Sequence, residues 1–175
     1  MIPAFVIHHK ACQERHEIVE KLCQQTGATI FPAILLSDGV EGCRLSHIEV
    51  ARLAKQKYPD QHYLVFEDDC VLAPHWGEMI DTFKDLVYLG YNDKCDKATF
   101  GTHALLISPL MRDIIINVAN QDYVVLKFQG KFDWILSYLA KAFEVKIKLP
   151  QYDDRNKYCW QKKGLRSLIT YAIRE

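Results

Sequence analysis

An apolar run followed by three carboxylates lies in the middle of the chain: Tyr63-Leu64-Val65-Phe66-Glu67-Asp68-Asp69. The apolar part predicts a buried strand over residues 62–66, with the acidic triplet at its carboxyl end. Strand-like and helix-like segments alternate on both sides of it, which favours an α/β fold with a largely parallel sheet. Ligands bind beyond the carboxyl ends of strands in such folds, so the triplet stands where a ligand site is expected.

The other expected elements follow from apolar spacing and from helix start and stop signals. Before the triplet these signals predict a strand at Ala4–His8, a helix over 14–25 that stops at Gly27, a strand over 29–36 and a helix over 46–56. After it they predict helices over 76–89, 133–143 and 164–174, a helix that begins at Pro109 behind a Ser108 cap, and strands over 103–107 and 145–149.

Length and composition limit the class of protein. The 175 residues fit a single domain spanning 1–175, and 49% hydrophobic with 25% charged residues is an ordinary globular balance. Lysine plus arginine equals aspartate plus glutamate, at 22 each. This balance argues against a general nucleic-acid-binding protein, which usually carries a basic excess.

Cysteine spacing and the apolar segments address the compartment. The six cysteines include no CxxC pair, which argues against a zinc ribbon or a thioredoxin-like site. The N-terminal sequence does not resemble a signal peptide, and no apolar run is long enough to span a bilayer. We therefore expect a soluble, cytoplasmic protein with reduced thiols. The amphipathic segment 164–174 leaves packing on the core, a partner contact and a peripheral membrane contact open.

The acidic triplet has a functional interpretation based on its charge. Three adjacent negative charges repel one another, so their clustering costs free energy unless positive charge offsets it. Carboxylate oxygens suit Mn²⁺ or Mg²⁺, and such an ion can bind the diphosphate of a nucleotide sugar and stabilise the charge on the leaving diphosphate. The alternative is a solvated acidic turn that caps a helix after Pro74.

A second motif, Gly42-Cys43-Arg44-Leu45-Ser46-His47, precedes the strand. Alone it predicts a helix start: Gly42 permits a tight turn, Ser46 caps the helix and His47 lies in the first turn. In that interpretation the cysteine is a small buried residue and the histidine is structural.

Together the two motifs resemble the family 25 glycosyltransferases, which include bacterial lipopolysaccharide galactosyltransferases and procollagen galactosyltransferases. Weaker pieces of the resemblance occur in the family's order: Ala4-Phe5-Val6-Ile7 with Glu14-Arg15, Phe31-Pro32-Ala33, Gly101-Thr102-His103-Ala104-Leu105-Leu106-Ile107-Ser108, and Phe132-Asp133-Trp134 with Leu149-Pro150. The chain departs from the family at His8-His9, where Asn-Leu is usual, and in the short segment 33–42.

The resemblance implies a GT-A fold, a nucleotide-binding α/β sandwich with a mostly parallel central sheet flanked by helices. It implies a metal-dependent, inverting transfer of a hexose, galactose above all, from a UDP-sugar to a glycan or glycoprotein acceptor. Asp69 is then the main Mn²⁺ ligand with Asp68 assisting, and Glu67 supports the loop. Asp133 is the candidate general base, for which a plain helix cap is the alternative.

Further residues are expected near the donor nucleotide. Arg15 is a candidate for contact with the phosphates, and His8 ends the first strand where the base would lie. Ser46 and His47, with Glu67 and Asp68, complete the expected binding residues. A surface arginine and structural histidines are the alternatives for Arg15 and His8.

Three other functions fit parts of the same pattern. A nucleotide-sugar-binding protein of the same fold without transferase activity is suggested by the shortened donor region. A metal-dependent phosphohydrolase would use the acidic triplet, although it usually needs more His and Asp ligands at strand ends. A structural partner module would need none of these side chains.

Overall fold

The fold is known from a computed structural model of the chain, which describes residues 1–89 and 102–149 together with the backbone of 159–161. In chain order its elements are β1 (Ala4–His8), η1 (Gln13–Arg15), α1 (His16–Thr26), β2 (Thr29–Pro32), α2 (Gly39–Lys57), β3 (Tyr63–Glu67), β4 (Cys70–Leu72), η2 (Trp76–Met79), β5 (Leu86–Tyr88), β6 (Ala104–Ile107), α3 (Pro109–Val118), α4 (Asp122–Phe128), α5 (Phe132–Ala142), β7 (Ile147–Lys148) and β8 (Cys159–Gln161).

The centre of the molecule is a six-stranded sheet in the order β2-β1-β3-β6-β5-β7. β1 is parallel to both β2 and β3, and β5 is parallel to β7, whereas β6 runs antiparallel to β3 and β5. Five strands therefore share one direction and β6 alone is reversed. A second, small sheet pairs β4 with β8.

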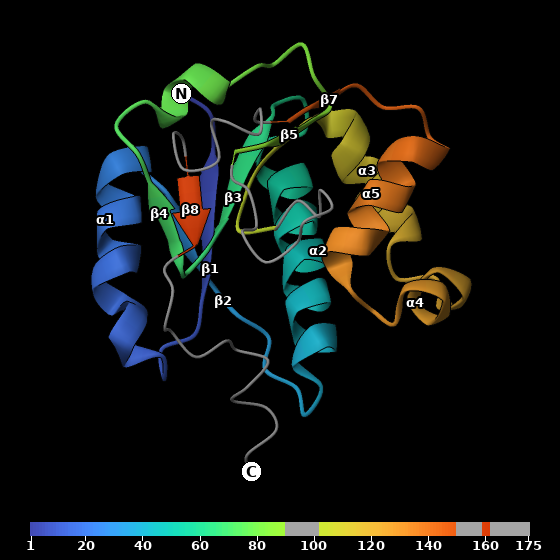
Figure 1. The fold of residues 1–175 in the computed structure, drawn as a ribbon, viewed down its shortest axis with the longest axis horizontal. Coiled ribbons are helices and arrows are strands. Elements are labelled where there is room, and N and C mark those ends of the chain that lie inside the picture. Colours follow the sequence, from blue (N-terminus) through green and yellow to red (C-terminus); the bar gives the residue numbers. More distant parts are fainter. Residues whose placement is uncertain (90–101, 150–158, 162–175) are drawn as a thin grey trace.

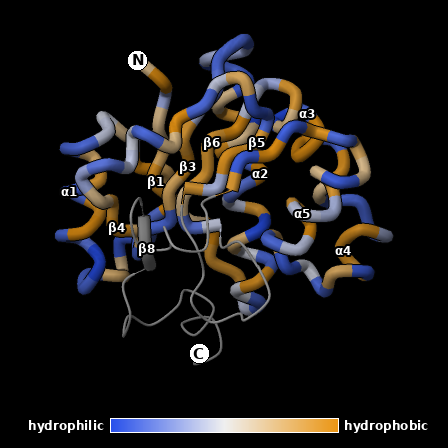
Figure 2. Tube along the Cα trace, turned by 45° about the horizontal axis from the view of Figure 1, so that its top comes forward, coloured by the Kyte–Doolittle hydropathy of each residue, from blue (hydrophilic) through white to orange (hydrophobic). Residues whose placement is uncertain are grey.

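Helices cover both faces of the large sheet, because alternate residues of each buried strand point to opposite sides (Figure 1). Ala4 and Val6 face the side covered by α1, and Phe5 and Ile7 face the side covered by α2, α3 and α5. In Figure 2 the hydrophobic colour runs along β3 and β6. Continuous apolar strands of this kind are expected where both faces are buried. The expected α/β fold with a mostly parallel, helix-flanked sheet is confirmed.

Several local expectations are confirmed. β1 has the predicted bounds, and α1 stops at Gly27, which adopts a left-handed conformation with φ of 69°. The Ser108 side chain accepts a hydrogen bond from the Met111 backbone N–H, and Pro109 opens α3. Among the described helices, none combines the length and hydrophobicity that a bilayer-spanning segment requires.

The predicted helix over 76–89 is wrong. The segment instead contains the short helix η2 and the strand β5, and Phe83, which the helical spacing placed on an apolar face, is 88% exposed. Its apolar residues fit a helical period, but the aromatic and β-branched residues Val87 and Tyr88 pair with β6 and are fully enclosed. Tertiary pairing therefore outweighs the local pattern. The helix α4 was not expected, and the predicted helix over 164–174 lies outside the described residues.

Two predicted helix starts are also wrong. α2 begins at Gly39, and the Asp38 carboxylate accepts hydrogen bonds from the backbone N–H groups of Val40 and Glu41, so Ser46 is not its cap and Gly42 is not a turn. The strand predicted over 29–36 ends at Pro32. α5 begins at Phe132, which places Asp133 inside the first turn and not at the cap.

Gly42 and Ser46 instead hold the connection between β2 and α2 against the helix. The Ser46 hydroxyl donates to the Gly42 carbonyl oxygen (2.8 Å) and accepts from the Ile34 backbone N–H (2.9 Å). A Cβ atom on Gly42 would lie 2.5 Å from the Ile34 carbonyl oxygen. Only glycine allows the backbone of this connection to approach α2 so closely.

We therefore expect Gly42→Ala to lower the free energy of unfolding by about 1–3 kcal/mol, the usual cost of forcing atoms into a filled site. Urea denaturation followed by circular dichroism measures the change. Gly77→Ala is the matched control, because a Cβ there meets no atom within 4 Å. Equal stabilities of the two variants would show that the contact with Ile34 is not a constraint.

Candidate functional site

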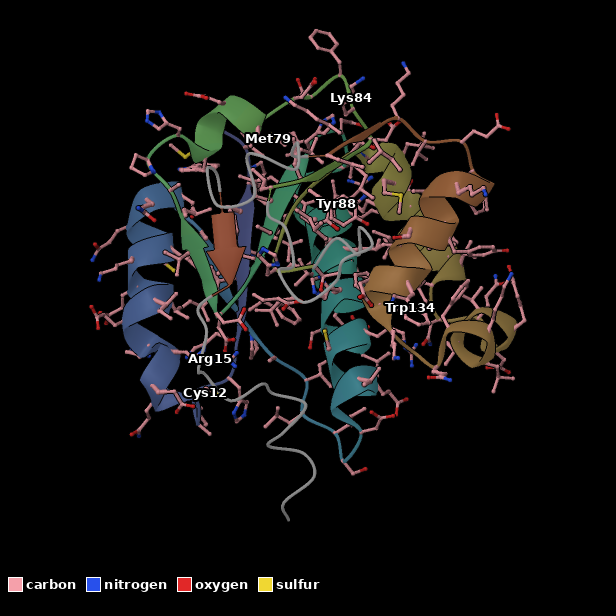
Figure 3. All side chains as sticks on the ribbon, in the orientation of Figure 1. Cys12, Arg15, Met79, Lys84, Tyr88 and Trp134 are labelled. Carbon is pink, nitrogen blue, oxygen red and sulfur yellow. The ribbon has the colours of Figure 1, made fainter. Side chains whose placement is uncertain are left out.

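The candidate site lies where β1 and β3 end and where β6 begins. His8 is the last residue of β1, Glu67 is the last residue of β3, and Thr102 comes two residues before β6. The turn that carries Asp68 and Asp69 joins β3 to β4. In Figure 3 the labelled Arg15 lies at this end of the molecule, beside the start of α1. The sheet thus brings together side chains that are up to 94 residues apart, from His8 to Thr102.

Asp68 is fully enclosed and both of its carboxylate oxygens have partners. Oδ1 accepts a hydrogen bond from Arg15 Nη1, and Oδ2 accepts one from His8 Nδ1 (3.0 Å). The exposed fractions are 1% for Asp68, 2% for Arg15 and 4% for His8. A buried carboxylate is tolerated when it is paired and hydrogen-bonded in this way. The alternative of a surface arginine at position 15 is therefore wrong.

Asp69 lies next to the same pair. Its Oδ2 is 3.8 Å from Arg15 Nη1, and the residue is 6% exposed. The guanidinium of Arg15 thus faces two adjacent carboxylates. It supplies positive charge that offsets their repulsion, so the charge cluster does not by itself require a metal ion.

Glu67 anchors a second set of contacts. Its Oε1 accepts hydrogen bonds from Thr102 Oγ1 (2.5 Å) and His47 Nε2 (3.2 Å), and Cys43 Sγ lies 4.0 Å from the same oxygen. The Glu67 backbone N–H donates to the His103 carbonyl oxygen (2.9 Å). Burial alone raises the pKa of Glu67, but the hydrogen bonds from His47 and Thr102 and the charges of His47 and His103 lower it to about 2. Glu67 is therefore an anionic anchor and not a proton acceptor at neutral pH.

His47 links this anchor to the start of α5. Its imidazole stacks on the Phe132 ring with centroids 4.6 Å apart, and the residue is 3% exposed. Asp133, the next residue along, is half-buried. Burial raises the pKa of Asp133 and the negative charge of Glu67 raises it further, against the opposing effects of backbone N–H groups and Lys131. A half-buried carboxylate with a raised pKa is better suited to accept a proton than an ordinary surface aspartate.

The predicted site residues do not all lie together. His8, Arg15, Asp68 and Asp69 form one group around the guanidinium, and His47 and Glu67 form another, with Asp133 within electrostatic reach of Glu67. Ser46 is 1% exposed and its hydroxyl already bonds the β2–α2 connection, so its expected contact with a nucleotide has no geometric support.

Two contributors were not among the expected site residues. Thr102 makes a short hydrogen bond to Glu67, and Cys43 lies within electrostatic reach of Glu67, Asp133, Asp69 and Asp68. Cys43 stands four residues before His47, so both can project from the same face of α2. Their four-residue spacing would have predicted that the two side chains lie close together, if the helix had been expected to begin before Cys43.

The donor sets for a metal ion differ between the two groups. Cys43, His47 and Glu67 form a set whose candidate ligand atoms all lie within 4.8 Å of one another. Asp68 does not fit an ion readily, because an incoming metal would have to displace Arg15 or His8 from its oxygens. Asp69 carries the other carboxylate of this turn, and carboxylate oxygens are the ligand type that Mg²⁺-type ions prefer.

Comparison with known proteins gives the fold. No family model matches the chain, and no curated protein sequence matches it. A glycosyltransferase involved in the glycosylation of the major capsid of PBCV-1 is similar in structure, with a TM-score of 0.63 and 12% identity over 97% of this chain and 98% of that one. The glycosyltransferase GlyE of Streptococcus pneumoniae TIGR4 gives a TM-score of 0.53 and 12% identity over 90% of this chain and 47% of that one. The chain therefore has the fold of these glycosyltransferase structures.

Replacing Arg15 tests how strongly the site depends on its buried ion pair. Arg15→Ala leaves the Asp68 charge enclosed without its main partner, so we expect the free energy of unfolding to fall by about 3–5 kcal/mol. The control is Lys21→Ala, which removes an exposed ion pair to Glu17 (2.8 Å) on the neighbouring helix and is expected to cost at most about 0.5 kcal/mol. Denaturant titration of both variants measures the difference. Similar losses would mean that the buried pair contributes no more than a surface pair.

Proposed function

We propose that the protein transfers a glycosyl group from a nucleotide sugar to a glycan or glycoprotein acceptor. One observation carries the proposal: Glu67, Asp68, Asp69 and Asp133 gather at the carboxyl end of a mostly parallel sheet, in a fold shared with glycosyltransferase structures. Ligand sites of α/β folds lie at this end. The description of one similar structure as a capsid glycosyltransferase supports a glycoprotein as one class of acceptor.

The donor diphosphate is assigned to the Arg15 side of the site. Arg15 is ion-paired to Asp68 and its Nη1 lies 3.8 Å from Asp69 Oδ2, while His8 bonds the other oxygen of Asp68. A guanidinium is well suited to phosphate oxygens. In this assignment Arg15 binds phosphate, and Asp68 and His8 are positioning residues.

A divalent ion, Mn²⁺ or Mg²⁺, is assigned to Asp69. When bound, such an ion neutralises charge on the leaving diphosphate. Asp68 is reassigned from assisting ligand to partner of Arg15, since both of its oxygens are already in use. Asp69 would hold the ion, and further oxygen ligands would come from the diphosphate, as Mg²⁺-type sites usually take them from substrate.

Asp133 is assigned as the general base that takes the proton from the attacking acceptor hydroxyl. Its raised pKa and its place beside Glu67 support this role. Direct attack by an activated hydroxyl inverts the configuration at the transferred carbon. The finer assignments, to family 25, to UDP-galactose and to a lipopolysaccharide or procollagen type of acceptor, rest on the motif resemblance around Gly42–His47 and Glu67–Asp69.

A nucleotide-sugar-binding protein without transferase activity is the second candidate. It is favoured by the pairing of Arg15 with Asp68, which leaves the triplet with its own internal cation. Binding and turnover must therefore be measured separately.

Calorimetric titration with UDP, UDP-galactose and UDP-glucose, first with Mn²⁺ and then with EDTA, measures donor binding. We expect binding that needs the metal and is weakened by more than about tenfold in Asp69→Asn, since loss of even a supporting residue costs that much at metal sites. Asp122→Asn, which changes an exposed carboxylate in the first turn of α4, is the control and should bind like the wild type. The proposed donor site would be overturned if none of the three nucleotides binds in the presence of Mn²⁺.

Release of UDP from the donor, with and without a panel of glycan and glycoprotein acceptors, measures turnover. We expect Asp133→Asn to keep donor binding but to lower the turnover rate by about 10²–10⁴-fold, the usual contribution of a general base. Wild-type turnover should fall as the pH drops through the raised pKa of Asp133, because the base must be deprotonated. Asp122→Asn again serves as control. If Asp133→Asn turns over like the wild type, another group is the base. If the wild type binds the donor but shows no turnover, the second candidate is supported.

A further inference from the structure

The proposed function assigns no ligand and no chemical step to Cys43 and His47, which both contact Glu67. Cys43 and His47 project from α2, one helical turn apart, toward Glu67 at the end of β3. These three residues supply a sulfur, a nitrogen and an oxygen, and their candidate ligand atoms lie within 4.8 Å of one another. We propose that this cluster binds a zinc-type divalent cation through Cys43, His47 and Glu67, at a site separate from the oxygen-ligand ion assigned to Asp69.

The spacing of the three atoms is close to that of a tetrahedral site. Zinc–ligand bonds of the usual lengths give ligand–ligand edges of about 3.4 Å for nitrogen to oxygen and about 3.6 Å for sulfur to oxygen. The corresponding distances here are 3.2 Å from His47 Nε2 to Glu67 Oε1 and 4.0 Å from Cys43 Sγ to Glu67 Oε1. The third edge, between the ligand atoms of Cys43 and His47, is within 4.8 Å, so side-chain shifts would have to shorten the edges to Cys43 for one ion to bond all three.

The protons that the side chains of the cluster carry also permit a cation to bind. Without an ion, three donors, from Thr102, His47 and Cys43, converge on one carboxylate oxygen of Glu67. An ion replaces two of them: the Cys43 thiol releases its proton to solvent, and His47 gives up the proton on Nε2 and binds as a neutral imidazole with its proton on Nδ1. Nδ1 is buried and has no hydrogen-bond partner among the described residues, so a proton on Nδ1 breaks no existing contact there.

Charge and access favour a cation as the occupant. Asp68, Asp69 and Asp133 act electrostatically on Cys43 together with Glu67, so the cluster lies in a negative potential. His47 is buried and its ring is fixed against Phe132, whereas Cys43 and Glu67 are partly exposed. An ion could therefore enter from the exposed side, where solvent would be available for the fourth position.

Ligand type separates this site from the one at Asp69. Thiolate and imidazole select zinc-type ions, while carboxylate and phosphate oxygens select Mg²⁺ or Mn²⁺. The two assignments use no common ligand, although a cation on Glu67 would also offset the charge that raises the pKa of Asp133. Occupancy of the cluster would join α2 to the end of β3, within electrostatic reach of Asp133.

The test uses the full chain, reduced with a phosphine, stripped of metal with EDTA and desalted, in the absence of nucleotide. Zn²⁺ affinity is measured by competition with a chromophoric chelator. Co²⁺ is then titrated as a spectroscopic probe, since a thiolate ligand gives a sulfur-to-cobalt charge-transfer band that an Asp69 site cannot produce. We expect stoichiometric binding of Zn²⁺, together with this band and the visible bands of tetrahedral Co²⁺.

Variants of the cluster identify the ligands. Cys43→Ala should abolish the charge-transfer band and weaken Zn²⁺ binding by more than about tenfold. His47→Gln should weaken it similarly while keeping a donor for Glu67, and circular dichroism checks that each variant is folded. The matched control is Cys23→Ala, a half-buried free cysteine on α1 that should leave the band and the affinity unchanged. The proposal is overturned if the wild type shows no thiolate band, or if Cys43→Ala binds Zn²⁺ as tightly as Cys23→Ala.

Discussion

The buried pair between Arg15 and Asp68 is the constraint on which the arrangement of the site depends. It joins the end of η1 to the turn after β3, and His8 ties the end of β1 to the same carboxylate. Burial of these groups is tolerable only because each charge has a partner, so the three segments must meet in one arrangement. The close parallel register of β1 and β3, with Ile7 opposite Glu67, brings the partners to the same edge of the sheet.

A second constraint organises the other half of the site. Glu67 receives contacts from α2 through His47 and from the start of β6 through Thr102, and His47 carries the contact onward to Phe132 in α5. Because β6 is antiparallel, its amino end lies beside the carboxyl end of β3. Because β6 is reversed, Thr102, which precedes its first residue, lies beside the carboxyl end of β3. A parallel strand would instead place the loop after its last residue there. The close approach of Ile34 to Gly42 sets how α2 lies against the same edge.

The sequence predicted the layers better than the local starts and stops. Buried strands such as β1 and β3 can be recognised from the sequence, because their apolar composition does not depend on which strands they pair with. The direction of β6 and the strand β5 were not recognisable, since both depend on partners distant in sequence. The start of α2 was missed because Ser46 is an equally good capping residue, and only the contact with Ile34 shows where its hydroxyl is used. The triplet could be placed from the sequence, but the cation that balances it could not, because Arg15 is 53 residues away from Asp68.

The distribution of positive charge divides the carboxylates into two kinds. Asp68 and Asp69 face a guanidinium that is enclosed with them, and an anionic ligand such as a diphosphate can share that cation. Glu67 is held anionic by His47 and Thr102, and its charge acts on Asp133, whose pKa rises as a result of burial and of that charge. Two neighbouring acids with opposite pKa shifts serve different purposes, one as a fixed charge and one as a proton acceptor. In the proposed transfer, the donor binds on the Arg15 side and the acceptor hydroxyl on the Asp133 side. Glu67 connects the two sides, because it precedes Asp68 in the chain, bonds His47 of α2 and acts through its charge on Asp133.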